Sequence, residues 1–194
     1  MGIIKLIKNE IHLTFERDPA ARSKAQIFFL YPGVKAIIYH RIAHKLYGMG
    51  RYFLADWVSM HARKVTGIEI HPAAQIGKNV FIDHGMGVVI GETAVVGDNC
   101  TIYQGVTLGG TGKDKGKRHP TIGNNVTIGS GAKILGPFTV GDNSKVAANA
   151  VVLNEIPPNS TCVGVPAHIV KREGVKIAPA KQVYVADLDQ IHFP

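Results

Sequence analysis

An aliphatic residue returns every six positions along most of the stretch from Ile70 to Val152. The recurring residues are Ile70, Ile76, Ile82, Ile90, Val96, Ile102, Leu108, Ile122, Ile128, Ile134, Val140, Val146 and Val152. A period of six fits neither an α-helix nor an alternating strand, but it fits short strands joined by turns around a prism. Repeats of this length are typical of a parallel β-helix. A β-sandwich is the weaker interpretation, because its strands would recur every 8–12 residues or so with variable loops.

Two insertions interrupt the repeat. Two extra residues follow Ile82, just after Asp83-His84-Gly85, and eight extra residues follow Leu108. The longer insertion, residues 109–121, combines glycines, basic residues and a histidine. Loops that leave a rigid scaffold often carry binding and catalytic residues. The sequence therefore predicts a functional site at these interruptions.

Helical periodicity precedes the repeat. The predicted helices cover about residues 4–15, 18–30, 34–47 and 51–65, with Asp18 as the N-cap of the second and Pro19 in its first turn. We predict an α+β protein with a helical domain at 1–67 and a β-helix at 68–170 that carries the 109–121 loop. A tail follows at 171–194, and its part from Ala178 to Pro194 is expected to be a loosely held arm.

Charge and cysteine content limit the classes of partner. The formal net charge is +8, but the basic residues are dispersed without an aromatic-interleaved stripe, which argues against nucleic acid. The densest basic cluster lies in the loop, where it fits either a small polyphosphate-bearing ligand or a solvated surface. Cys100 and Cys162 do not indicate a disulfide framework, and neither a signal peptide nor a membrane span is expected. Cytoplasm is the expected location.

His40 and His44 stand one helical turn apart, a spacing that can bind zinc. No third ligand follows in that helix. We therefore favour their being polar positions on a packed helix.

Several motifs together resemble bacterial serine acetyltransferase. They are Arg17-Asp18-Pro19-Ala20-Ala21, Arg41-Ile42-Ala43-His44, residues 67–74, Phe81-Ile82-Asp83-His84-Gly85, Val89-Ile90-Gly91-Glu92-Thr93 and the whole of 108–120. The resemblance implies a left-handed β-helix that forms a homotrimer, with active sites between neighbouring prisms. It also implies acetyl transfer from acetyl-CoA to the hydroxyl of L-serine, which gives O-acetylserine for cysteine synthesis.

The resemblance gives His84 the role of general base and Glu69 that of the carboxylate which orients it. A base is needed because a serine hydroxyl is a poor nucleophile until its proton is removed. Taken alone, His84 could equally be a turn residue. Many members of the family carry Asp where this chain has Glu69.

The same resemblance assigns the substrate contacts. Asp18 and Asp83 would hold the ammonium group of serine, and Arg118 would bind its carboxylate. His119 would contact the same substrate or the developing oxyanion, so it has both a binding and a catalytic role. The alternatives are a helix cap for Asp18 and a solvated loop for Arg118 and His119.

Coenzyme A is expected to lie between stacked coils, where small residues permit close approach. The matching positions are Gly110, Ser130, Gly131 and Ala148, with Lys145, Lys171 and Arg172 available to phosphates. Tight coils also require Gly and Ala for themselves. Acyl transfer from a thioester needs no metal.

Assembly and regulation follow from the resemblance as expectations. Only seventeen residues precede Asp18, so a trimer is as consistent as a dimer of trimers. The chain ends in Ile191-His192-Phe193-Pro194 rather than in a terminal Ile, which argues against a tight complex with cysteine synthase. L-Cysteine is expected to be a feedback inhibitor.

Three other functions fit the same fold. The acceptor could be a sugar or another amino acid, although Arg118 with Asp18 favours a zwitterion. A β-helical metal hydratase would need His71, His84 and His119 to converge at a subunit boundary. A non-catalytic regulatory subunit would not need the set formed by His84, Glu69, Arg118 and His119.

Overall fold

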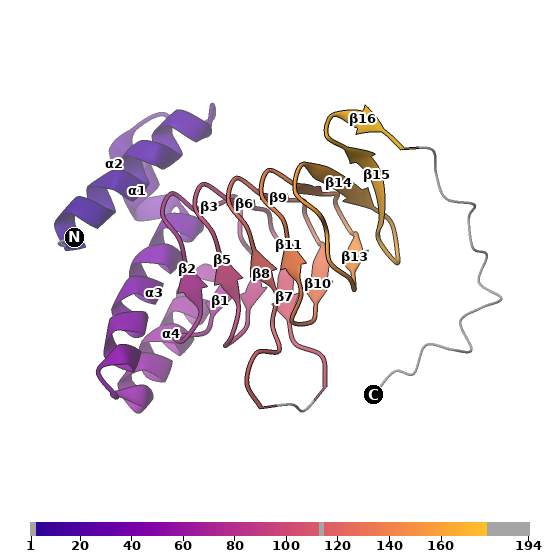
Figure 1. Ribbon diagram of the computed structural model, residues 1–194. Coiled ribbons are helices and arrows are strands. Elements are labelled where there is room, and N and C mark those ends of the chain that lie inside the picture. The colour runs from indigo at the N-terminus through magenta and orange to yellow at the C-terminus, as the bar shows by residue number, and fades with distance from the viewer. Residues whose placement is uncertain (1–2, 113–114, 178–194) are drawn as a thin grey trace.

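A computed structural model describes residues 3–112 and 115–177 of the chain. Its helices are α1 (Ile3–Arg17), α2 (Lys24–Leu30), α3 (Pro32–Gly48) and α4 (Tyr52–Thr66). Short strands follow, wound into a prism, and the helices lie at its first coil (Figure 1). None of the described helices is both long and apolar enough to cross a membrane.

The strands form three sheets, one on each face of the prism. Sheet A contains β1 (Glu69–Ile70), β4 (Val89–Ile90), β7 (Thr107–Gly109), β10 (Lys133–Leu135) and β13 (Val151–Val152). Sheet B contains β2 (Gln75–Ile76), β5 (Val95–Val96), β8 (Thr121–Ile122) and β11 (Thr139–Val140). Sheet C contains β3 (Phe81–Ile82), β6 (Thr101–Ile102), β9 (Thr127–Ile128), β12 (Lys145–Val146), β14 (Ser160–Val163), β15 (His168–Arg172) and β16 (Val175–Lys176).

Successive coils stack in register. Ile70 pairs with Ile90, and Ile82 pairs with Ile102, both in parallel. All thirteen recurring aliphatic residues are at most 8% exposed, so the period of six is the period of the buried column. The predicted fold, a helical region followed by a left-handed parallel β-helix, is confirmed.

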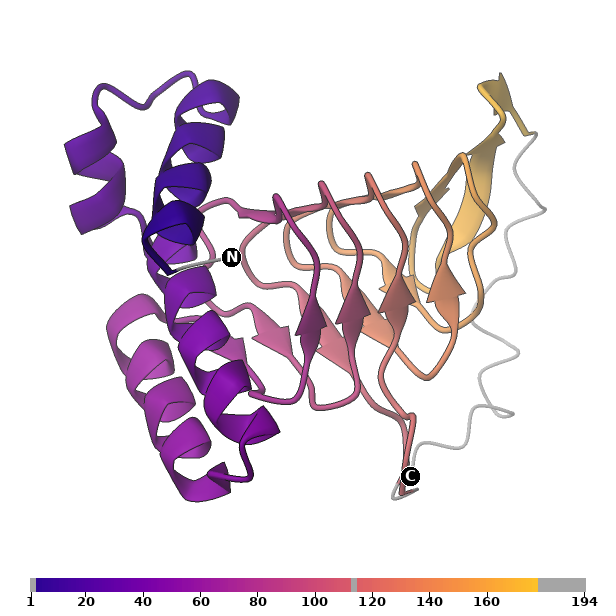
Figure 2. The same ribbon diagram turned by 60° about the vertical axis from the view of Figure 1, so that its left-hand side comes forward.

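The turns between the sheets form three edges, which Figure 2 shows as rows of stacked corners. We call them the C–A edge, the A–B edge and the B–C edge after the sheets they join. The B–C edge is regular: its corners place an asparagine at positive φ in Asn79, Asn99, Asn125, Asn143 and Asn159. Asparagine tolerates this left-handed backbone better than most residues. The two insertions lie on the other two edges.

Side chains of α3 and α4 close the first coil. Many backbone N–H groups of each coil donate to carbonyls of the next, as from Glu69 to Val88 at 2.9 Å, so several carbonyls of the first coil have no earlier coil to supply a donor. The helices supply the missing donors. These are Ser59 to Ile70 O (2.6 Å), His44 Nδ1 to Pro72 O (2.7 Å), His40 Nε2 to Ala74 O (3.1 Å), and Arg41 to Ile76 O and Gly77 O. Unpaired strand edges are otherwise open to other chains.

The contact between α3 and the first coil explains why two histidines stand one turn apart on this helix. A carbonyl only accepts hydrogen bonds, so His40 and His44 each donate from one ring nitrogen. Their rings are stacked with centroids 5.5 Å apart. The two residues thus serve packing, which was the favoured interpretation of their spacing.

The second helix begins later than the sequence indicated. Its N-cap is Ser23, whose hydroxyl accepts from the N–H of Gln26 at 3.1 Å. Asp18 instead accepts from the N–H of Ala20 at 2.8 Å, within a separate turn. The predicted helix cap at Asp18 is therefore wrong, because a serine five residues later supplies the cap and releases the carboxylate.

The last coil ends in an antiparallel extension. β14 pairs with β15, and β15 with β16, both antiparallel. The boundary expected after residue 170 falls inside β15. The predicted arm from Ala178 to Pro194 lies outside the described residues.

Candidate active site

His84 lies at the centre of a strained turn on the C–A edge. Its φ is 56°, and the N–H of Gly85 donates to the carbonyl of Asp83 at 2.6 Å. A hydrogen bond from i+2 to i around a residue with positive φ is the rare, strained form of the γ-turn. The side chain that this turn projects is 74% exposed, and its Nε2 lies 3.8 Å from Asp83 Oδ1. The two-residue insertion therefore presents an imidazole to solvent.

Two carboxylates, those of Asp18 and Asp83, lie near the side chain of Tyr31. The hydroxyl of Tyr31 donates to Asp18 Oδ2 at 2.5 Å. That hydrogen bond, together with burial and the charges of Asp18 and Asp83, raises the pKa of Tyr31 to about 12. Since a nearby negative charge opposes loss of the phenol proton, both aspartates lie within electrostatic reach of one tyrosine. Sequence reasoning missed Tyr31, because its position indicated only the end of a helix.

Close packing of α3 on β3 holds this cluster in place. A Cβ added to Gly33 would lie 2.1 Å from the carbonyl oxygen of Ile82. Only glycine allows the start of α3 to approach that strand so closely. The contact holds Tyr31, two residues before Gly33, near Asp83, which follows Ile82.

Glu69 has a different partner from the one expected. Its Oε2 lies 3.0 Å from a guanidinium nitrogen of Arg63 on α4. Within the described residues, the one ion pair of His84 is with Asp83. The structure of the free chain thus pairs Glu69 with an arginine rather than with the imidazole it was expected to orient.

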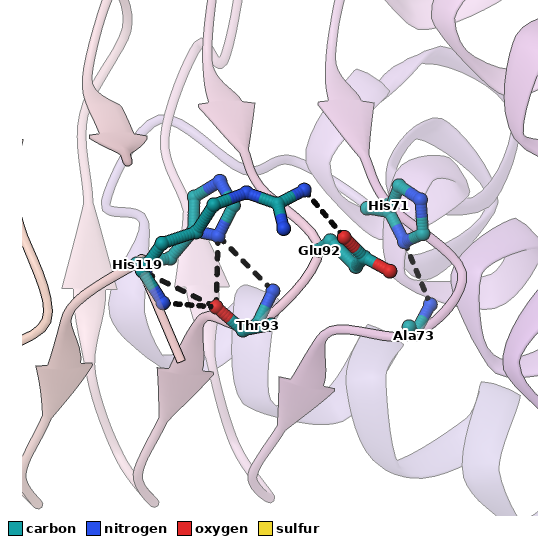
Figure 3. Close-up of polar contacts among 6 residues, drawn as sticks. His71, Ala73, Glu92, Thr93 and His119 are labelled. Carbon is teal, nitrogen blue, oxygen red and sulfur yellow. Dashed lines mark hydrogen bonds and ion pairs between the residues drawn. The ribbon is translucent and has the colours of Figure 1, made fainter. Parts of the chain in front are cut away.

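The long insertion leaves the prism between β7 and β8 and returns along the A–B edge (Figure 1). Its return is fastened to Thr93, in the corresponding turn of the previous coil (Figure 3). The hydroxyl oxygen of Thr93 accepts from the backbone N–H groups of Arg118 (3.0 Å) and His119 (3.1 Å). Lys117 Nζ donates to the carbonyl of Thr93 at 2.7 Å. Sequence reasoning missed this role of Thr93, because nothing local shows where the insertion folds back.

His119 is buried at the end of the insertion, with 8% exposure. Its Nδ1 lies 3.2 Å from the N–H of Thr93 and 2.9 Å from the Thr93 hydroxyl. Burial, followed by the charge of Arg118, lowers the pKa of His119 below its ordinary value. The ring lies over Gly91, where a Cβ would come within 2.0 Å of Nε2.

Arg118 turns its guanidinium to the carboxylate of Glu92, the residue before Thr93. Both side chains are about one-third exposed, at 32% and 35%. This partly exposed ion pair can open to a ligand carboxylate, since a partly solvated ion pair is weak. A groove of about 410 Å³ lies beside it, lined by residues that include Glu92, Thr93 and Lys117.

The two insertions bring their side chains to different edges of one prism. His84, Asp83 and Asp18 belong to the C–A side, whereas Arg118 and His119 belong to the A–B edge. Sheet A lies between them. A single chain therefore does not bring the predicted base and the predicted carboxylate-binding arginine together.

Three of the residues expected to bind coenzyme A lie on the C–A edge. Ser130 and Gly131 form the turn before β10, and Ala148 lies in the turn before β13. The Ser130 carbonyl accepts from the Asn149 N–H at 2.8 Å, so these turns stack directly. Coils are roughly 4.8 Å apart, so the row from His84 to Ala148 spans three spacings, about 14 Å.

The other expected contacts flank this row or lie apart from it. Lys145 (β12) and Lys171 and Arg172 (β15) are exposed on sheet C. Gly110 lies on the A–B edge, where its added Cβ would be 3.1 Å from the side chain of Arg118.

The three histidines of the metal-hydratase alternative, His71, His84 and His119, do not gather within one chain. His71 accepts from the N–H of Ala73 at 3.1 Å (Figure 3), while His84 lies on another edge. In residues 3–112 and 115–177, no three His, Cys, Asp or Glu side chains gather as metal ligands would.

Comparison with known families and proteins agrees with the architecture. Residues 119–154 match the model of the bacterial transferase hexapeptide (six repeats), and residues 74–109 match that of the hexapeptide repeat of succinyl-transferase. A serine acetyltransferase of Staphylococcus xylosus is 58% identical over 174 residues, which are 90% of this chain and 81% of that protein.

Solved structures extend the comparison. Serine acetyltransferase of Neisseria gonorrhoeae in complex with serine is 44% identical, with a TM-score of 0.83 over 87% of this chain and 69% of that one. The enzyme of Brucella abortus in complex with coenzyme A is 46% identical, with a TM-score of 0.84 over 87% and 68%. A serine acetyltransferase in complex with cysteine is 42% identical, with a TM-score of 0.85 over 90% and 68%. With a relative more than half identical over most of both chains, and with this fold and these side chains, the chain belongs to the serine acetyltransferase family.

Proposed function

We propose that the protein is a serine O-acetyltransferase, which transfers the acetyl group of acetyl-CoA to the hydroxyl of L-serine. The observation that carries the proposal is that the chain presents an exposed imidazole, on a row of small-residue turns at one edge of the prism, and a partly exposed arginine beside a buried histidine at another edge. Relatives of the same architecture hold serine and coenzyme A in their solved structures.

His84 is the general base of the proposed reaction. Its imidazole takes the proton of the serine hydroxyl as that oxygen attacks the thioester carbonyl of acetyl-CoA. The tetrahedral intermediate carries its negative charge on the former carbonyl oxygen, and His119 donates a hydrogen bond to it. Collapse breaks the carbon–sulfur bond, and the leaving thiolate of coenzyme A takes from His84 the proton that came from serine. The products are O-acetylserine and free coenzyme A.

The charged groups suit a small zwitterion. Asp18 and Asp83 bind the ammonium group, while Arg118 exchanges Glu92 for the substrate carboxylate. Glu69 orients His84 when it leaves Arg63. L-Cysteine carries the same two charged groups, and a relative binds it, so we propose that cysteine inhibits by competing with serine.

The working form is a trimer or a larger assembly of trimers. His84 and Arg118 lie on different edges of the prism, so a second copy must place its A–B edge against the C–A edge of the first. Three prisms around an axis parallel to their own satisfy this contact three times and close the ring. Such a site would contain Gly110 of one copy beside the Ser130–Ala148 row of another, along which coenzyme A lies.

Subunit complementation tests this arrangement. One variant carries His84→Asn and the other carries both Arg118→Ala and His119→Gln; each alone lacks one half of every site. Co-expressed in equal amounts, they should recover about a quarter of wild-type activity, because a quarter of random neighbour pairs unite two intact halves. No recovery in mixed trimers proven by mass spectrometry would contradict a site shared between copies.

The acceptor is tested directly. Release of thiol from acetyl-CoA is measured with L-serine, with other amino acids and with sugars. Preference for serine, with competitive inhibition by L-cysteine, is expected. A sugar as the best acceptor would place the chain's activity elsewhere within acyl transfer. We further propose that the reaction occurs in the cytoplasm, where the free, buried thiols of Cys100 and Cys162 remain reduced.

A further inference from the structure

We infer that Thr93 is a positioning residue that holds His119 as a neutral imidazole with its proton on Nε2. The inference deepens the proposed function and rests on it for the role of His119. It follows from the hydrogen bonds around one hydroxyl group, counted donor by donor.

The hydroxyl oxygen of Thr93 has two acceptor sites and one proton. Its acceptor sites are filled by the backbone N–H groups of Arg118 and His119, at 3.0 and 3.1 Å. Its proton is therefore left for the third neighbour, Nδ1 of His119, at 2.9 Å. The direction of this contact is set by the two others.

Nδ1 receives a second donor from the same residue. The backbone N–H of Thr93 points to it at 3.2 Å, and an amide N–H only donates. A ring nitrogen that faces two donors must carry a lone pair, so the proton of neutral His119 is on Nε2. Figure 3 shows the Nδ1 side of the ring turned to Thr93.

The Nε2–H group is available to a ligand. Within the described residues no hydrogen bond to Nε2 of His119 is found, and Nε2 is not among the fully buried atoms without a partner. A neutral donor suits a developing oxyanion, because it stabilises negative charge without giving up its proton. The same arrangement excludes His119 as the base that removes the serine proton.

Protonation of His119 would break the arrangement. A proton on Nδ1 would face the N–H of Thr93 and force its hydroxyl to give up an acceptor contact. The neighbouring charges work in both directions: Arg118, Lys117 and His71 lower the pKa of His119, and Glu92 raises it. Burial is the largest cause and favours the neutral ring.

The test compares Thr93→Val with Thr93→Ser. Valine keeps the shape and the backbone N–H but removes the hydroxyl, whereas serine keeps the hydroxyl. We expect kcat to fall roughly 10- to 100-fold in Thr93→Val, with the KM for serine changed less, and to stay within about threefold in Thr93→Ser. Thr127→Val on sheet C, where no side-chain hydrogen bond is found in the described part of the chain, controls for loss of a hydroxyl.

Histidine nitrogen NMR reads the tautomer without substrate. The ¹⁵N signals of His119, assigned with a His119→Gln spectrum, should show the Nε2–H form at neutral pH in the wild type and in Thr93→Ser. In Thr93→Val this preference should weaken, and the acid limb of the kcat profile should move to higher pH, because a donor to the neutral ring is lost.

Two results would overturn the inference: an Nδ1–H or doubly protonated ring in the wild type, or a Thr93→Val enzyme with unchanged tautomer and kcat. Its failure differs from failure of the proposed function. A chain that holds the Nε2–H tautomer but does not acetylate serine would refute only the activity. A chain that acetylates serine with an unaffected tautomer in Thr93→Val would refute only the role of Thr93.

Discussion

The two insertions place a histidine on each of two edges of the same prism, but they give the two side chains opposite environments. His84 sits in a strained turn with its side chain 74% exposed. His119 is 8% exposed and hydrogen-bonded on one side by Thr93. In the proposed reaction the first ring is the base, whereas the second stays in one neutral form and donates a hydrogen bond. A regular scaffold would thus obtain a base and a donor from one residue type by changing only the loop that carries it.

The largest effect is expected at the exposed ring. His84→Asn should lower kcat by about 10²- to 10⁴-fold, the usual contribution of a general base. Asparagine tolerates a φ of 56°, so the fold and the assembly should be preserved, as checked by circular dichroism and light scattering. Activity near that of the wild type would remove His84 as the base and end the contrast between the two rings.

The second prediction concerns Gly91, over which the buried ring of His119 lies. Gly91→Ala adds a methyl group that would lie 2.0 Å from Nε2 of His119, so the ring must move. A displaced oxyanion donor should lower kcat about 10²- to 10³-fold. Gly48→Ala is the control, since a Cβ there meets nothing within 4 Å. An unchanged kcat in Gly91→Ala, with His119 still buried, would mean that the position of this ring does not matter to the reaction.

A smaller effect is expected from Tyr31, which donates a hydrogen bond to Asp18 near the exposed ring of His84. Tyr31→Phe removes the donor to Asp18 but leaves the ring that packs there. Loss of one such hydrogen bond, about 1 kcal/mol, should raise the KM for serine roughly fivefold without changing kcat. Spectrophotometric titration should also lose the phenol with a pKa of about 12. If kcat falls instead and KM stays constant, Tyr31 acts on the base rather than on the substrate.

A third histidine, His40, is buried but has no role in the proposed reaction, so it tests the effect of burial on stability alone. Burial lowers the pKa of His40 to about 3, whereas an unfolded histidine titrates near 6.5. The folded state thus favours the neutral ring, and this contribution to stability is complete above pH 6.5 and is lost as the pH falls toward 3. His40→Gln keeps a donor for Ala74 but does not titrate. Between pH 7 and pH 4 its unfolding free energy should therefore fall less than that of the wild type, while its activity at pH 8 stays near normal. Parallel stability profiles would show that His40 does not limit acid stability.

Local pattern was sufficient for the scaffold. The recurrence from Ile70 to Val152 predicted the buried column, because each coil repeats one inward position. The same pattern predicted both insertions, since a break in a strict period is visible without knowing the fold. Motif resemblance then gave His84, Arg118 and His119 their expected roles.

Contacts between segments far apart in the chain could not be predicted from the sequence. Thr93 meets Arg118 and His119 across 25 and 26 residues, and Tyr31 meets Asp18 across a helix whose start was misplaced. Glu69 lies beside Arg63 because α4 packs against β1, which periodicity does not reveal. Each of these depends on where the chain returns, and hexapeptide spacing carries no information on that.

The covering of the first coil has a consequence for growth of the stack. A coiled parallel sheet is a template that could add further chains end on, as fibrils do. Here Ser59, His44, His40 and Arg41 occupy the carbonyls at one terminus of the stack, and an antiparallel hairpin is laid across sheet C at the other. Both coverings oppose the end-on addition of further chains to the stack.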